Sequence, residues 1–172
     1  FKIMKPTLSF YTNIPSPYNL DLFEAMSKHF QLKVIYYSKI ESGRQWHIDT
    51  EHPQYQSTVL ENNFIGRFIQ KFKSEFHFSS DILKYALNDA SEYVILGGNY
   101  FSPNTYSVLL ASNIKKKKIF WFGEKLLPTH SFIKTTIKKI LLAPLFKSCL
   151  GILCVGQAAI ESYQSFGYKG DC

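Results

Sequence analysis

Arginine is scarce in this sequence: only Arg44 and Arg67 occur among the 20 basic residues of the 172-residue chain. The net charge of +7 therefore comes almost entirely from lysine. Surfaces that read nucleic-acid bases usually depend on arginine, whose planar guanidinium makes paired contacts with a base edge. We therefore expect no nucleic acid as a partner. The lysines favour an anionic neighbour such as a phosphate ester or an anionic lipid.

Cysteine and long apolar runs are also scarce. An odd number of cysteines does not suit a disulfide framework, so we expect a reduced, cytoplasmic protein in which the first two thiols are core residues; the cysteines are Cys149, Cys154 and Cys172. The longest apolar stretch, 140–156, is interrupted by Pro144 and Lys147. It is shorter than the roughly 20 residues that a membrane-spanning helix needs, and the N-terminus lacks the pattern of a signal peptide.

Short apolar runs alternate with segments of helical periodicity along the chain. The pattern predicts strands at 7–13, 32–38, 56–61, 93–97, 118–122 and 151–155. It predicts helices at 19–30, 79–90, 103–112, 132–146 and 157–166. Residues 39–78 are the least regular, and we expect a long excursion there with a single strand. The alternation predicts an α/β fold, namely one Rossmann-like domain with an open parallel sheet and helices on both faces.

Ligands of such a sheet bind beyond the carboxyl ends of the strands, near the point where the strand order reverses. The loop after the first strand lacks both the Gly-x-Gly-x-x-Gly of dinucleotide sites and the Gly-Lys-Ser/Thr of phosphate-binding loops, so neither NAD nor ATP is expected. Asn13 and Ser16 lie in this loop, where free backbone N–H groups can hold a phosphate or a sugar hydroxyl. The alternative is that both side chains only cap the turn.

Two further loops offer polar groups at predicted strand ends. Gly97, Gly98, Asn99 and Tyr100 follow the fourth strand, where glycine permits close approach and an asparagine can both donate to and accept from a hydroxyl. The alternative is ordinary loop chemistry. Glu124 is the only acid at a predicted strand end, and its carboxylate can orient an acceptor hydroxyl. The alternative is that it caps or pairs with a neighbour.

The loop after the second strand combines rare residues. Arg44 can clamp a phosphate and Trp46 can stack on a sugar face; the alternative is a solvated arginine beside a tryptophan that covers the loop. Histidines and acids also lie nearby, but their spacing does not match a standard metal site, so we expect a surface loop and no metal. These residues are His47, Asp49, Glu51 and His52.

Four segments together resemble the N-terminal, acceptor-side domain of family-4 GT-B glycosyltransferases, especially enzymes of the bacterial polysaccharide type. The strongest is L-C-V-G-Q-A-A-I-E-S-Y-Q-S-F-G at 153–167, which is similar to the family's strand, Gly-Ser/Glu-Ala-Ala, Tyr and Gly pattern before the interdomain linker. The others are P-S-P-Y-N-L-D-L-F at 15–23, G-R-Q-W at 43–46 and F-G-E-K-L at 122–126.

The resemblance implies an acceptor-binding domain that faces a nucleotide-sugar-binding domain, which we expect beyond Cys172 and which is absent from this chain. It implies retaining transfer of a sugar from a nucleotide-sugar to a glycan or lipid-linked acceptor, without a metal cofactor. The 172 residues alone are then expected to be inactive. The first loop lacks the family's common Gly-Gly, and 98–101 contains no histidine or aspartate. The resemblance therefore leaves the acceptor and any general base unassigned.

Within this hypothesis, Glu124 and Asn99 are the candidate catalytic residues, and the other singled-out polar, glycine and aromatic residues are candidates for acceptor binding. The candidate binding residues are Asn13, Ser16, Arg44, Trp46, Gly98 and Tyr100. The rival hypothesis is a non-catalytic Rossmann-like module that binds an anionic ligand or a membrane-bound partner. A methyltransferase is disfavoured, because no glycine-rich loop follows the first strand and no acid ends the second.

The predicted helix at 132–146 interleaves lysines with apolar residues. The apolar residues Ile133, Ile137, Ile140 and Leu141 are expected to pack onto the sheet. The alternative is attachment to the anionic inner face of a membrane, because neighbouring lysines are attracted to anionic lipid. The lysines of this helix are Lys134, Lys138 and Lys139, and the run at 115–118 adds more.

Overall fold

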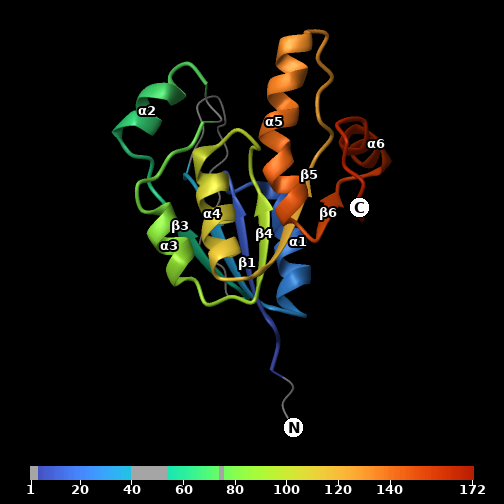
Figure 1. Ribbon diagram of the computed structural model, residues 1–172. Coiled ribbons are helices and arrows are strands. Elements are labelled where there is room, and N and C mark those ends of the chain that lie inside the picture. Colours follow the sequence, from blue (N-terminus) through green and yellow to red (C-terminus); the bar gives the residue numbers. More distant parts are fainter. Residues whose placement is uncertain (1–3, 40–53, 74–75) are drawn as a thin grey trace.

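Six parallel strands form one sheet in the computed structural model, which describes residues 4–39, 54–73 and 76–172. The strand order is β3-β2-β1-β4-β5-β6 (Figure 1). The strands are β1 (Thr7–Thr12), β2 (Gln31–Tyr36), β3 (Gln56–Val59), β4 (Tyr93–Gly97), β5 (Lys118–Gly123) and β6 (Gly151–Cys154). The helices are α1 (Pro17–Ser27), α2 (Phe64–Gln70), α3 (Ile82–Asn88), α4 (Pro103–Ile114), α5 (Phe132–Ser148) and α6 (Gln157–Ser165). The predicted Rossmann-like α/β fold is confirmed.

Apolar side chains of the central strands point alternately to the two faces of the sheet, as a strand's period of two requires. Leu8 and Phe10 of β1 join a core with Phe23 of α1. Tyr11, the next residue, joins the other core, to which α3, α4 and α5 contribute. Figure 1 shows these three helices in front of the sheet and α1 behind it. Because both faces are covered, the strands read as nearly continuous apolar runs.

Helix α2 is the element that the sequence analysis missed. Its apolar side chains do not enter the core: Phe64 is 84% exposed and Phe68 is 54% exposed. A helix without a buried face lacks the amphipathic pattern that predicts helices. Its local signal is Asn63, whose Oδ1 accepts a hydrogen bond from the backbone N–H of Gly66 at 2.8 Å and so caps the first turn.

Helix α5 corrects a second expectation. The expected packing onto the sheet holds for its C-terminal half, where Leu142 and Leu145 are buried. It is wrong for Ile133, Ile137 and Ile140, which are 69%, 51% and 65% exposed. The N-terminal half of α5 extends past the strand ends in Figure 1, so the sheet cannot cover it.

The cysteines lie at the margin of the core. Cys149 and Cys154 are half-buried beside it and Cys172 is exposed, and all three thiols are free. Burial raises the pKa of Cys149 to about 12, so its thiol stays protonated and unreactive at neutral pH. Within the described part of the chain, no helix is long and apolar enough to cross a membrane.

Candidate functional site at the carboxyl ends of the strands

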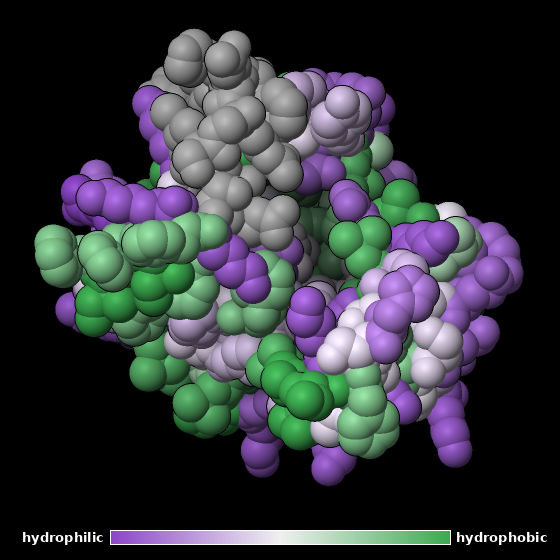
Figure 2. Space-filling view, turned by 90° about the horizontal axis from the view of Figure 1, so that it is seen from above, coloured by the Kyte–Doolittle hydropathy of each residue, from purple (hydrophilic) through white to green (hydrophobic). Residues whose placement is uncertain are grey.

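A pocket of about 650 Å³ opens at the carboxyl ends of β1, β4 and β5. The chain leaves β1 toward β2 on one side, and β4 lies on the other side, so this is the point where the strand order reverses. Figure 2 looks down on this end of the molecule and shows the hollow, with hydrophobic side chains gathered over α2 at the left. The location agrees with the general rule for ligand sites in open α/β sheets.

Six of the eight candidate site residues line this one pocket. They come from the three loops that follow β1, β4 and β5, and they are Asn13, Ser16, Gly98, Asn99, Tyr100 and Glu124. The other two, Arg44 and Trp46, lie outside the described residues, as do the histidines and acids at 47–52. The rule that ligands bind at the carboxyl ends of the strands thus selected residues that are far apart in the sequence but line one pocket.

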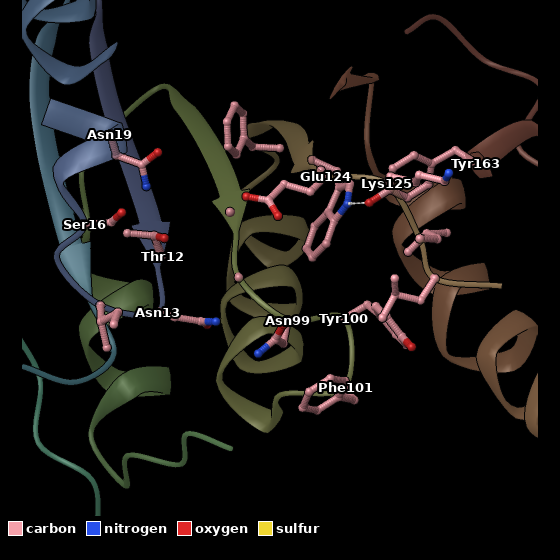
Figure 3. Close-up of a pocket in the computed structure, with 18 of the residues that line it drawn as sticks. Thr12, Asn13, Ser16, Asn19, Asn99, Tyr100, Phe101, Glu124, Lys125 and Tyr163 are labelled. Carbon is pink, nitrogen blue, oxygen red and sulfur yellow. Dashed lines mark hydrogen bonds between the residues drawn. The ribbon is translucent and has the colours of Figure 1, made fainter. Parts of the chain in front are cut away.

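The loop after β1 presents two polar side chains that do not cap the turn. Ser16 occupies the position before α1, but its side chain makes no capping hydrogen bond. The side-chain oxygen of Asn13 is buried and accepts no hydrogen bond from any described residue. Figure 3 shows the Asn13 side chain extending toward Asn99 across the pocket. The capping alternative is therefore wrong for both side chains.

Gly98 allows the loops after β1 and β4 to approach each other. A Cβ atom at this position would lie 2.9 Å from Oδ1 of Asn13 and 3.0 Å from the ring of Tyr37. The next residue is fixed through its backbone: the carbonyl of Asn99 accepts hydrogen bonds from Thr105 Oγ1 and from the backbone N–H of Ser102, both at 3.0 Å. The Asn99 side chain is thereby held at the pocket wall.

Glu124 provides the carboxylate of the pocket. It is exposed, and Figure 3 shows its carboxylate directed into the cavity from the end of β5. The ion pairs and hydrogen bonds among the described residues do not include it. The alternative that Glu124 caps or pairs with a neighbour therefore has no support in this structure.

Two aromatic residues that the sequence analysis did not select form part of the pocket wall. Trp121 Nε1 donates a hydrogen bond to the hydroxyl oxygen of Tyr163 at 2.8 Å. Burial is the largest cause that raises the pKa of Tyr163, to about 12, so the phenol stays neutral at physiological pH. Trp121 lies within an apolar strand and Tyr163 on a distant helix, so each alone indicates only a core position.

The pocket therefore combines neutral amide and hydroxyl groups, one carboxylate, the side chains of Lys125 and Lys138, and aromatic walls. Amides both donate and accept hydrogen bonds, which suits the hydroxyls of a sugar, and aromatic rings suit its apolar face. No protein-family model matches the sequence, and comparison with curated proteins finds no significant match. The chain is therefore a Rossmann-like α/β protein with a polar, aromatic-walled pocket at the switch point of its sheet.

Proposed function

We propose that this pocket binds a hydroxyl-bearing acceptor and that the chain is the acceptor-binding half of a retaining GT-B glycosyltransferase. One observation carries the proposal: polar side chains from three loops converge on the switch-point pocket, and two of them, Asn13 Oδ1 and the Glu124 carboxylate, have no partner among the described residues. Buried polar groups in proteins are usually paired, so an unpaired one that lines a pocket suits a ligand. The family resemblance adds the reaction.

In this proposal Glu124 and Asn99 act on the attacking group. The Glu124 carboxylate accepts a hydrogen bond from the acceptor hydroxyl and so directs the lone pair of the hydroxyl oxygen at the anomeric carbon of the sugar to be transferred. As the acceptor oxygen bonds to this carbon, the bond to the nucleoside diphosphate breaks, and the hydroxyl proton leaves with the diphosphate. Asn99 holds a neighbouring hydroxyl, and the aromatic wall holds the apolar face of the acceptor ring. The gain in rate then comes from positioning and from stabilisation of developing charge.

The nucleotide-sugar is assigned to a second domain. The loops that line the pocket lack a glycine-rich phosphate-binding sequence. The proposal therefore expects the 172 residues to bind acceptor without transferring sugar, and it requires no metal ion.

Glycosyl transfer by the full-length gene product tests the proposal. UDP- and GDP-sugars are supplied with a lipid and glycan extract of cell envelopes. The Glu124→Gln and Asn99→Ala variants are expected to lose about tenfold or more in acceptor-dependent turnover, because Glu124→Gln removes the charge that strengthens its hydrogen bond to the acceptor hydroxyl and Asn99→Ala removes a hydrogen bond. Affinity for the donor should remain unchanged. Glu161→Gln, which alters an exposed acid of α6, is the matched control and should behave as the wild type.

Two results would contradict this assignment. One is an equal loss of donor affinity in the Glu124→Gln and Asn99→Ala variants, which would place these residues at the donor. The other is the absence of transfer with every donor offered. The rival, a non-catalytic module that binds an anionic ligand, predicts that Glu124→Gln leaves ligand binding intact or strengthens it, because it removes a negative charge.

A further inference from the structure

A second groove of about 330 Å³ adjoins the proposed acceptor pocket. Its walls come from α5, from the loop after β4 and from Lys73, which follows α2. Tyr100, Phe101 and Lys138 line both the groove and the pocket. Figure 3 shows Tyr100 and Phe101 on adjacent parts of the loop after β4. One ligand can therefore occupy both cavities.

The groove carries positive charge without a neutralising carboxylate among the described residues. Three lysines line it, Lys73, Lys134 and Lys138, and none of its described lining residues is acidic. The ion pairs within the described ranges that are formed by lysine involve Lys117 and Lys118, at the opposite end of the sheet. Burial lowers the pKa of Lys138, as expected for an ammonium group that lacks a nearby carboxylate.

Aromatic rings and one carbonyl contact the ammonium groups of two of the three lysines, Lys73 and Lys138. The Lys73 ammonium lies 3.5 Å from the centroid of the Phe101 ring. The Lys138 ammonium lies 5.0 Å from the Phe166 centroid and 5.7 Å from the Tyr100 centroid, and it donates a hydrogen bond to the carbonyl of Leu127 at 2.7 Å. Such contacts restrict flexible lysine side chains before a ligand arrives, which lowers the entropy cost of binding.

We propose that this groove binds the phosphate or pyrophosphate group of a phosphorylated acceptor, with Lys73, Lys134 and Lys138 as the donors. The hydroxyl-bearing part of the same acceptor then lies in the larger pocket beside Glu124. This assignment rests on the proposed function for the identity of the ligand as an acceptor. The floor of the groove includes Ile137 and Leu141, which suits an apolar substituent on the phosphate.

Titration of the 172-residue chain with inorganic pyrophosphate, followed by calorimetry, tests the groove. We expect saturable binding of one pyrophosphate that weakens as ionic strength rises. Lys73→Gln and Lys138→Gln should each weaken binding about tenfold, because a hydrogen bond to a charged group is lost. Lys139→Gln removes the same charge from α5 outside the groove lining and should weaken binding less than about twofold. Circular dichroism and thermal unfolding establish that every variant is folded.

Two outcomes would overturn the proposal. One is the absence of saturable pyrophosphate binding by the folded wild-type chain. The other is equal weakening by Lys139→Gln and by the two groove variants, which would show attraction to net charge alone.

A competition experiment separates a lipid headgroup from a soluble phosphate ester as the source of the phosphate. The chain is bound to phosphatidylglycerol vesicles, with phosphatidylcholine vesicles as the control, and pyrophosphate is added at constant ionic strength. If pyrophosphate releases the wild-type chain from the vesicles but does not release the Lys73→Gln variant, the groove binds a lipid headgroup. Tight pyrophosphate binding without release assigns it to a soluble phosphate ester. Either result upholds phosphate binding in the groove.

Failure of this inference and failure of the proposed function give different results. Glu124→Gln and Asn99→Ala should leave pyrophosphate binding at least as strong as in the wild type, because neither residue lines the groove. Pyrophosphate binding without glycosyl transfer by the full-length protein would refute the proposed function and retain the anion site. Transfer without pyrophosphate binding would refute the groove and retain the transferase.

Discussion

Polar side chains at the two ends of the sheet differ in whether they have partners within the protein. At the amino ends of β4 and β5, the buried carboxylate of Asp89 lies 3.0 Å from the ammonium of Lys117 and accepts a hydrogen bond from the Tyr11 hydroxyl at 3.1 Å. Ser91 donates to it from both its backbone N–H and its hydroxyl. At the carboxyl ends, the Glu124 carboxylate and Asn13 Oδ1 have no partner among the described residues. A partnered carboxylate stabilises the fold, whereas an unpartnered one at a pocket is available to a ligand.

The largest expected effect breaks the network at the amino ends. Asp89→Ala should lower the free energy of unfolding by about 3–5 kcal/mol, because the Lys117 charge is left buried without a partner. Urea unfolding at neutral pH measures this loss. The neighbouring pair Glu92–Lys118, at 2.8 Å and about half exposed, is the matched control. Glu92→Ala should cost less than about 1 kcal/mol, and equal losses for both variants would contradict the contrast between them.

Filling the space at Gly98 should have the next largest effect. Gly98→Ala places a methyl group against Asn13 and the Tyr37 ring, so we expect a loss of about 1–3 kcal/mol in the free energy of unfolding and a narrower pocket. Thermal unfolding and acceptor binding measure the two consequences. A variant as stable as the wild type, with unaltered ligand affinity, would show that the close approach of these loops is unimportant.

Acid should destabilise the amino-end network. Burial raises the pKa of Asp89, but the Lys117 charge and the hydrogen bonds from the serines lower it more, so the pKa of the folded state lies below the ordinary value. This contribution to stability is complete above the unfolded pKa of about 4 and is lost as pH falls through the folded pKa. Urea unfolding is measured between pH 6 and pH 3 in steps of about one pH unit. The free energy of unfolding should depend less steeply on pH for Asp89→Asn than for the wild type. Equal pH dependence of the free energy of unfolding in Asp89→Asn and the wild type would contradict this role of the Asp89 carboxylate.

The smallest expected effect concerns membrane attachment at the carboxyl ends of the strands, where exposed apolar and lysine residues of α5 extend past the sheet. We propose peripheral binding to an anionic leaflet. Each lysine near such a surface contributes about 1 kcal/mol, so Lys139→Gln should reduce partitioning onto phosphatidylglycerol vesicles about fivefold. Lys28 follows α1 at the opposite end of the sheet, so Lys28→Gln should have little effect on partitioning onto the vesicles. Sedimentation that is indifferent to lipid charge and to salt would contradict the electrostatic mechanism.

The sequence predicted the sheet well because buried parallel strands are short apolar runs between helical segments. It also predicted six pocket residues, since the carboxyl ends of parallel strands meet at one edge. Trp121 and Tyr163 were missed because their meeting depends on how α6 packs against β5. Helix α2 was missed because it lacks a buried face, and the lysine groove was missed because Lys73 and α5 are distant in the sequence.

Mapping of ligand contacts on the backbone tests most directly that the carboxyl ends of the strands form the ligand site. Amide nuclear magnetic resonance spectra of the 172-residue chain are recorded during titration with inorganic pyrophosphate and with a panel of methyl glycosides. We expect shift changes to cluster at 12–16, 97–101 and 121–127, with additional changes around Lys73 and Lys138 for pyrophosphate, whereas the signals of Asp89 and Lys117 should remain unchanged. Changes that centre on Asp89 and Lys117, or the absence of any cluster with either class of ligand, would contradict this expectation.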